Sequence, residues 1–258
     1  LQADNDITFT DALTLTTNGA TLTAQAGNDI LVNANISTTN GAISLTANDA
    51  GGIQTGTGAV TMADGVAINA GNADITLDAA GNLTLENLTT TGNITLTTSA
   101  GSIAQTSADQ MIAADSLTAT AGGAITLATN ITSLDASSTT AGAIAITETD
   151  AITLTDVDTA NGSITVNAGG AITATDVAST TDTDANDINL TTTAGDIAVA
   201  TISAGNLGDV TLNAAGAITD AGAGVTADLL TANAGGAITL DTSINSLTAS
   251  TSAVGDVA

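Results

Sequence analysis

Apolar and polar residues alternate along most of the chain, in short runs separated by small, turn-forming residues. Residues 161–177, with the sequence NGSITVNAGGAITATDV, show this pattern most clearly. A period of two is typical of half-buried β-strands, and Asn-Gly and Gly-Gly pairs are typical of turns. The stretch therefore predicts two short strands and, after the next turn, the start of a third. The apolar positions that alternate with polar residues are Ile164, Val166, Ile172, Ala174 and Val177.

The same pattern returns about every 20 residues, so the chain is a repeat protein. The first two copies superimpose Ile7 on Ile30, Leu13 on Ile36 and Leu22 on Ile43. Later copies have their leading apolar residues at Ile75, Ile94, Leu117, Ile144, Ile164, Ile188, Val210 and Leu229. A shorter apolar segment closes many copies, at Leu88, Val157, Val177, Ile202 and Ile244.

Repeats of this length with three strands each predict an all-β fold, the right-handed parallel β-helix or β-solenoid. We expect about 12 coils of roughly 20 residues, each with three short strands that pair with the same strands of the next coil. A helical fold is disfavoured because Thr, Asn, Asp and Gly dominate and the apolar period is two. The expected organisation is a single repeat domain over residues 1–258, as a segment of a longer surface protein.

The composition restricts the partners that this chain can bind. It has 26 acidic residues and no Lys, Arg or His, so its formal net charge is −26. Nucleic acid is excluded as a direct partner because no side chain can neutralise phosphates. Membrane insertion is not expected, because no apolar run approaches the length of a membrane span. The absence of Lys and Arg also removes every trypsin cleavage site, which suits a protease-rich exterior.

The residue inventory argues against an enzyme. Without His, Cys or Lys, no side chain of the usual kind can activate a Ser or Thr nucleophile, and zinc lacks its common ligands. Paired carboxylates could still serve a glycosidase, so a β-helix carbohydrate-active enzyme is kept as an alternative. We expect no catalytic residues and no organic cofactor.

Calcium is the ion that the acidic loops of the sequence suit best. Asp182, Asp184 and Asp187 lie in the loop TDTDANDI, and oxygen-rich loops suit a hard cation. These three residues are the predicted calcium ligands. The loop lacks the Gly and the terminal Glu of an EF-hand, and aspartates in turns also cap backbone amides. Other acidic pairs occur at Asp4 and Asp6 and in TDVD, which contains Asp156 and Asp158.

Threonines at every second position raise the alternative of ligand binding by a strand face. Segments such as ITFT, LTLT and ITLTT would place Thr side chains in rows on the outside of the solenoid. Such rows resemble insect-type ice-binding surfaces, although Thr is also an ordinary exposed strand residue. Four residues interrupt the pattern: Ser44, Asp78, Asn189 and Asp241.

The lines GNITLTTSAGSIAQT, NGAISLTANDAGGI and NAGGAITATDV resemble the repeats of filamentous-haemagglutinin-type adhesins and related giant bacterial surface proteins. The resemblance covers nearly the whole chain. It implies a right-handed β-helical shaft that is exported and displayed on the cell surface.

Together these observations predict a non-catalytic structural segment of an extracellular adhesin shaft or cell-surface filament. Its expected partners are neighbouring coils or subunits of the same protein, and a cell-surface or glycan receptor. The alternatives are a β-solenoid that binds calcium, carbohydrate or ice, and the carbohydrate-active enzyme named above.

Overall fold

The computed structural model describes residues 1–48, 57–107, 109–253 and 257. Strands and turns make up the described chain, which contains no helix, and every strand pairing in it is parallel. The prediction of a right-handed parallel β-helix is confirmed, with about 11 turns rather than 12. Residues 49–53, which belong to one of the adhesin-like lines quoted above, lie outside the described residues.

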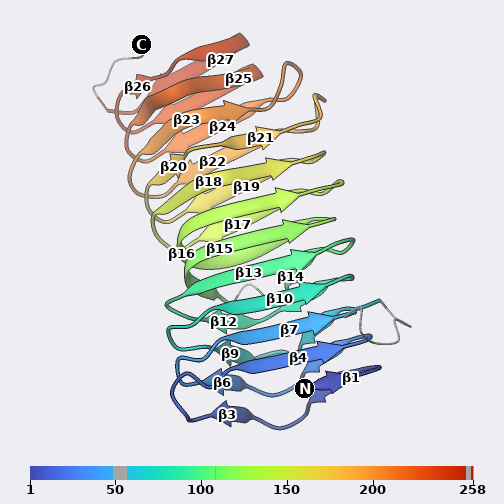
Figure 1. Ribbon diagram of the computed structural model, residues 1–258. Helices are drawn as coiled ribbons and strands as arrows, with labels where there is room; N and C mark the ends of the chain where they lie inside the picture. The colour runs from blue at the N-terminus through green and yellow to red at the C-terminus, as the bar shows by residue number, and fades with distance from the viewer. Residues whose placement is uncertain (49–56, 108, 254–256, 258) are drawn as a thin grey trace. The chain divides into compact units, whose positions relative to one another are not determined.

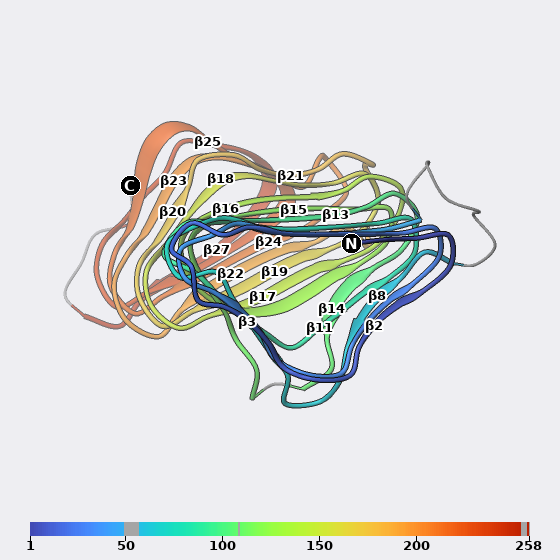
Figure 2. The same ribbon diagram turned by 60° about the horizontal axis from the view of Figure 1, so that its bottom comes forward.

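The chain divides into two compact units, Leu1–Ile131 and Thr132–Ala258. In both, the chain visits three rows of parallel strands in turn, which we call rows A, B and C, and Figure 1 shows the strands stacked coil on coil. Figure 2 shows the same coils from a direction closer to their ends.

The first unit contains β1 to β15 and the start of β16. Row A consists of β1 (Gln2–Ala3), β4 (Leu22–Ala26), β7 (Ile43–Ala47), β10 (Ile75–Ala79), β13 (Asn93–Thr98) and the end of β15 (Ile112–Ala121). Row B consists of β2 (Ile7–Phe9), β5 (Ile30–Val32), β8 (Val60–Met62), β11 (Leu83–Leu85), β14 (Ile103–Gln105) and the start of β16 (Ile125–Ser138). Row C consists of β3 (Leu13–Leu15), β6 (Ile36–Thr38), β9 (Ala67–Asn69), β12 (Asn87–Thr89) and the start of β15.

The second unit repeats the arrangement with longer strands that turn from one row into the next. Row A consists of β17 (Ile144–Glu148), β19 (Ile164–Ala168), β22 (Ile188–Thr192), β24 (Val210–Ala214) and the ends of β25 (Ile218–Ala234) and β27 (Thr242–Thr251). Row B consists of residues 133–134 of β16, β20 (Ile172–Ala174), β26 (Ile238–Thr239) and the starts of β18 (Ile152–Thr159), β23 (Ile197–Ser203) and β25. Row C consists of β21 (Val177–Ser179) and the row-C parts of β16, β18, β23, β25 and β27.

The register follows the superposition of the repeats. The three predicted pairs of the first two copies, Ile7 with Ile30, Leu13 with Ile36 and Leu22 with Ile43, are Cα partners in adjacent strands. A one-residue slip would turn every apolar side chain outward, so the buried face specifies this register strongly.

The superposition is wrong by one residue at the last clear copy. Val210 pairs with Leu230, not with Leu229. The side chain of Leu230 points into the core, as that of Ala232 does two residues later, and it is 1% exposed, whereas Leu229 is only half-buried. Two adjacent leucines made either choice possible in the sequence, and the alternation of the whole strand decides between them.

Inward residues stack on like residues of the neighbouring coils and form the core of each unit. In the coil of residues 161–177, the side chains of Ile164, Val166 and Val177 are completely buried and Ile172 is 1% exposed. Full burial of a side chain of this size contributes roughly 1.5–3 kcal/mol to folding. These residues therefore form one layer of a core, as the sequence predicted.

The turns between coils pack too closely for a side chain at some glycines. A Cβ atom added to Gly235 would lie 1.9 Å from the carbonyl oxygen of Ala215, one coil away. The Gly-Gly pairs of the repeat therefore mark contact between turns as well as bends in the chain. Along the parts of the chain that the structure describes, no helix is long and apolar enough to cross a membrane.

Candidate functional site

The predicted calcium loop places all three aspartates at the surface, but two of their carboxylates are engaged. Oδ1 of Asp182 accepts hydrogen bonds from the backbone amides of Asn206 and Leu207, both at 2.8 Å. Oδ1 of Asp187 accepts one from the amide of Asp209 at 3.0 Å. Both aspartates thus cap the turn of the following coil, which is a common use of Asp in turns.

The structure does not gather the loop into a metal centre. Within the described residues, no group of three or more His, Cys, Asp or Glu side chains is placed to hold a metal ion. Asp184 is exposed, and it belongs to the same loop as the two capping residues. Calcium binding by Asp182, Asp184 and Asp187 remains a prediction that titration can test.

A second acidic group lies in the second unit, where strand register stacks aspartates in consecutive coils. Asp135 is the Cα partner of Asp156. Asp176 follows one coil later, because its carbonyl accepts from the amide of Val157. Asp158 lies beside them on row C, where its Oδ2 accepts from Oγ of Ser137 at 3.3 Å.

We call Asp135, Asp156, Asp158 and Asp176 the aspartate column, and two of them have a raised pKa. Burial is the main cause of the raised pKa of Asp135, and the negative charge of Asp156 adds to it. Burial also raises the pKa of Asp158, the hydrogen bond from Ser137 opposes the rise, and the charges of Asp156, Asp135 and Asp176 add to it. The sequence shows these aspartates only as separate residues, because their proximity comes from the coil-to-coil register.

Both glutamates of the chain are buried and act as local acceptors. Glu86 is fully buried, and its Oε2 accepts from the backbone amide of Gly65 at 3.3 Å. Oε1 of Glu148 accepts from the amides of Thr149 and Asp150, at 2.8 and 3.3 Å. Their environments suit a role in fixing turns.

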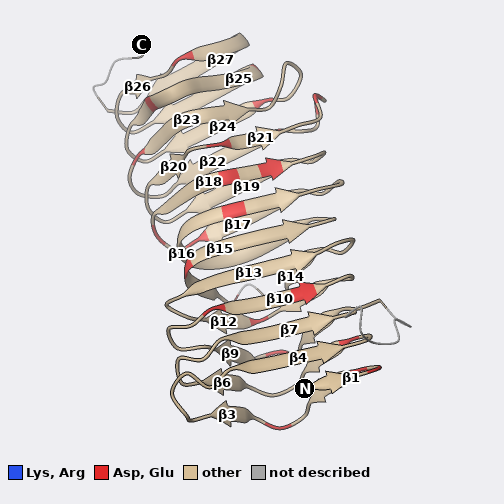
Figure 3. Cartoon of the chain, viewed as in Figure 1, with Lys and Arg blue, Asp and Glu red and all other residues tan. Residues whose placement is uncertain are grey.

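Two outward columns of row A in the second unit carry no charge. They run through six strands in register, and none of their twelve residues is acidic. Figure 3 marks the acidic residues of the chain in red. One column holds Ala145, Thr165, Asn189, Thr211, Thr231 and Thr248; the other holds Thr147, Asn167, Thr191, Asn213, Asn233 and Ser250.

The threonine rows expected from the sequence are therefore mixed rows of hydroxyls and amides. Asn189 interrupts a row as expected, and in the first unit Ser44 and Asp78 lie on row A. Asp241 lies outside row A, between β26 and β27. The row expected from the sequence mixed residues of rows A, B and C, because threonines alternate with apolar residues in the strands of all three rows.

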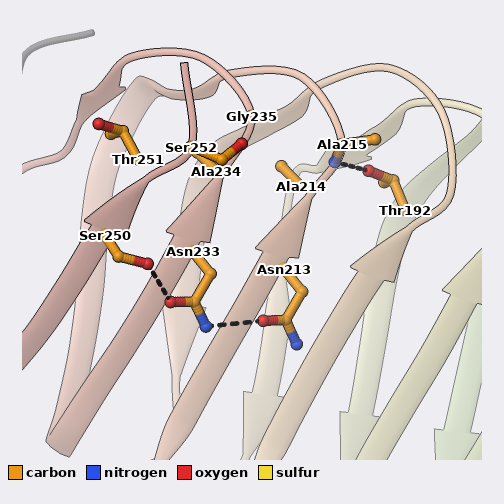
Figure 4. A pocket seen from close by; sticks show the side chains of 10 residues that line it. All are labelled: Thr192, Asn213, Ala214, Ala215, Asn233, Ala234, Gly235, Ser250, Thr251 and Ser252. Carbon is orange, nitrogen blue, oxygen red and sulfur yellow. Dashed lines mark hydrogen bonds between the residues drawn. The ribbon is translucent and has the colours of Figure 1, made fainter. Parts of the chain in front are cut away.

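A shallow groove of about 360 Å³ follows one edge of this surface (Figure 4). Its amide ladder consists of Asn213, Asn233 and Ser250, which lie in one line across β24, β25 and β27. Nδ2 of Asn233 donates to Oδ1 of Asn213 at 2.9 Å, and Oγ of Ser250 donates to Oδ1 of Asn233 at 2.6 Å. The other lining residues are Thr192, Ala214, Ala215, Ala234, Gly235, Thr251 and Ser252.

The groove offers hydrogen bonding without charge. Its lining contains only small side chains, hydroxyls and amides, so it can bind a neutral polar ligand but has no group for acid–base chemistry. The sequence alone does not identify these residues as a site. The signal was present as Thr-x-Asn at residues 211–213 and 231–233, but its meaning depends on the register of the strands.

The last coil of the second unit exposes an apolar surface. β27 pairs with β25 on one side, and the described residues place no strand against its other edge. Leu247 continues the buried row-A column but is 53% exposed, and it borders an apolar cavity of about 300 Å³. That cavity is lined by Leu230, Ala232, Ile238, Leu240, Thr242, Leu247, Ala249 and Val257.

Comparison with known proteins identifies a repeat family for part of the chain. Residues 186–254 match a family described as repeats of unknown function, DUF5649. No curated protein and no solved structure matches the chain. The match supports the repeat organisation of the second unit, and the resemblance to filamentous-haemagglutinin-type adhesins remains a prediction from the sequence.

Proposed function

We propose that the chain is a non-catalytic shaft or filament segment of an extracellular bacterial adhesin or surface fibre. One observation carries this proposal: like apolar residues stack in register through consecutive coils. In row A of the second unit the stack runs through Ile188, Val210, Leu230 and Leu247. A core that repeats along the strand-pairing direction can be lengthened by adding coils, and it needs no other element to complete it.

The exposed end of the second unit supports stacking of further coils or subunits. The free edge of β27 presents backbone amides and carbonyls that an added parallel strand would pair. Leu247 and its neighbouring cavity present the apolar surface that an inward residue of that strand would cover. The interface would repeat the contacts between coils within the unit.

The extracellular location rests on composition and on the resemblance to surface adhesins. The chain has no Lys or Arg for trypsin-like proteases and no Cys that an oxidising exterior would modify. Its −26 charge keeps shafts apart laterally at low ionic strength, while stacking buries neutral surface.

Immunogold electron microscopy of the producing cells tests the proposal. Antibodies raised against this chain should label fibres or rods at the cell surface at many points along their length. Label confined to the cell interior, or to globular particles, would refute the shaft function.

The purified chain tests stacking separately, through its mass at increasing protein and salt concentration. We expect larger assemblies in salt, and we expect Leu247→Asp to prevent them. Leu207→Asp is the matched control, because Leu207 is also 53% exposed but lies in the turn between β23 and β24. Equal effects of the two substitutions would refute stacking through the end of the unit.

A further inference from the structure

We propose that the groove on row A of the second unit binds a neutral, extended polysaccharide through the amide ladder Asn213, Asn233 and Ser250. This inference adds a ligand to the shaft proposed above. It needs the shaft only as the place where the groove is displayed, and it does not need the chain to assemble into filaments.

The charge of the surroundings selects a neutral ligand. None of the ten residues that line the groove is charged, and the two outward columns of row A in this unit are free of carboxylates. An anionic polymer would find no cationic side chain and would be repelled by a net charge of −26. A metal ion would find no carboxylate in the lining.

The hydrogen bonds of the ladder leave capacity for a ligand. A side-chain amide has two N–H donors and an oxygen with two acceptor sites. Asn233 uses one donor on Asn213 and one acceptor site on Ser250, so one N–H and one lone pair remain. Asn213 is left with the same capacity, because it donates once to Thr191 and accepts once from Asn233. Each asparagine therefore offers a donor and an acceptor side by side, which matches adjacent hydroxyl groups of a sugar, whereas Ser250 has donated its single O–H and offers only acceptor sites.

The spacing of the rungs selects an extended glycan over a peptide. Neighbouring strands lie about 4.8 Å apart, so the ladder repeats at that distance. An extended chain of pyranose rings advances by one ring over a similar distance. An extended peptide advances by about 3.3 Å per residue, so its successive residues would not lie opposite successive residues of the ladder.

Recognition would depend on hydrogen bonds alone. The only aromatic residue, Phe9, is 7% exposed and belongs to the first unit, so this groove has no aromatic ring on which a sugar could stack. Each ring should therefore bind weakly, and affinity should increase with the number of rungs that one glycan occupies. The groove volume of about 360 Å³ is at the lower end of the range for small-ligand sites.

Affinity electrophoresis of the full chain in gels with soluble polysaccharides tests the inference. We expect retardation by at least one neutral polymer among a β-glucan, a galactomannan and a xyloglucan, and none by anionic alginate. The double variant Asn213→Ala, Asn233→Ala should raise the apparent Kd roughly tenfold. The matched control is Thr173→Ala, Thr219→Ala, which removes two exposed hydroxyls from row B of the same unit and should bind like the parent.

Far-UV circular dichroism establishes that both double variants are folded before they are compared. Retardation by none of the neutral polymers, retardation by alginate alone, or equal losses in the two double variants would each overturn the proposal. Thermal hysteresis that is lost only in the Asn213, Asn233 variant, without polysaccharide binding, would mean that the surface binds ice instead. Leu247→Asp separates this test from that of stacking, because it should abolish assembly and leave glycan binding unchanged.

Discussion

Two leucines that are partners in adjacent strands provide a direct measure of how much the stacked core stabilises the fold. Leu230 and Leu247 occupy the same row-A column, in β25 and β27. Leu230 is 1% exposed because coils cover it on both sides, whereas Leu247 is 53% exposed in the last coil. Each is replaced by alanine in a separate variant, so that the residue types are identical and only the coverage differs.

The expected losses of stability differ severalfold. Replacing a buried leucine removes about 2 kcal/mol of transfer free energy, and the cavity that remains raises the total to about 3–5 kcal/mol. At Leu247 about half of the side chain already faces water, and solvent can fill the space that is left. The transfer term alone then gives about 1 kcal/mol for Leu247→Ala.

Urea unfolding followed by far-UV circular dichroism is the appropriate assay, because the chain has no Trp or Tyr to report by fluorescence. The midpoint should fall markedly for Leu230→Ala and slightly for Leu247→Ala. Parallel measurements at several protein concentrations show whether association contributes to either value.

A loss for Leu247→Ala equal to that for Leu230→Ala would refute the argument that the last coil is open. If that loss grew with protein concentration, Leu247 would be covered by another molecule. If it did not, the end of the unit would be packed differently in solution. Equal and small losses would instead show that the stacked core contributes less than its burial indicates.

Three further predictions concern charge, backbone conformation and the aspartate loop. Burial and neighbouring carboxylates raise the pKa of Asp135 and Asp158 in the folded protein. Between the ordinary carboxyl pKa and this raised pKa, the folded protein therefore binds more protons than the unfolded chain. Stability should therefore rise as pH falls through that window, and Asp156→Asn should raise the melting temperature at pH 7 and reduce its pH dependence. In urea unfolding, Gly224→Ala should reduce the free energy of unfolding more than Gly65→Ala does. Both glycines have a positive φ, +82° and +74°, but only at Gly224 would the new Cβ meet a backbone oxygen, at 1.9 Å. Equal losses of stability would contradict this close approach. Asp182→Ala should lower stability by about 1 kcal/mol through loss of its capping hydrogen bonds, while Asp184→Ala should change little. Calorimetric titration of calcium tests the predicted site: saturable heat in the parent that disappears in both aspartate variants would support it, and no heat in the parent would contradict it.

The fold could be predicted in detail because each repeat contains its own structural information. A period of two, interrupted by glycine and asparagine pairs, specifies short strands and turns without reference to distant residues. Copies at a nearly constant spacing then specify which strands are neighbours, as the pairing of Ile7 with Ile30 shows. The error at Leu229 arose where two equivalent residues were adjacent and only the parity of the complete strand distinguished them.

The candidate site could not be predicted in the same way, because its residues come from successive coils. The loop of Asp182 and Asp187 seemed suited to a cation on local grounds, yet the next coil supplies backbone amides to both carboxylates. The amide ladder shows the opposite case. Asn213 and Asn233 are unremarkable in the sequence and become one surface only when parallel register places them side by side.

The sequence by itself determined the repeating strand, the direction in which its apolar side chains point and the uniform negative charge. These properties depend on residue type and on neighbours within one repeat. Tertiary structure alone decided which outward residues line up along the coil axis, which aspartates share a column and which leucines are covered by coils on both sides. Stacking creates those relationships, because parallel strands bring residues about 20 positions apart to within 5 Å.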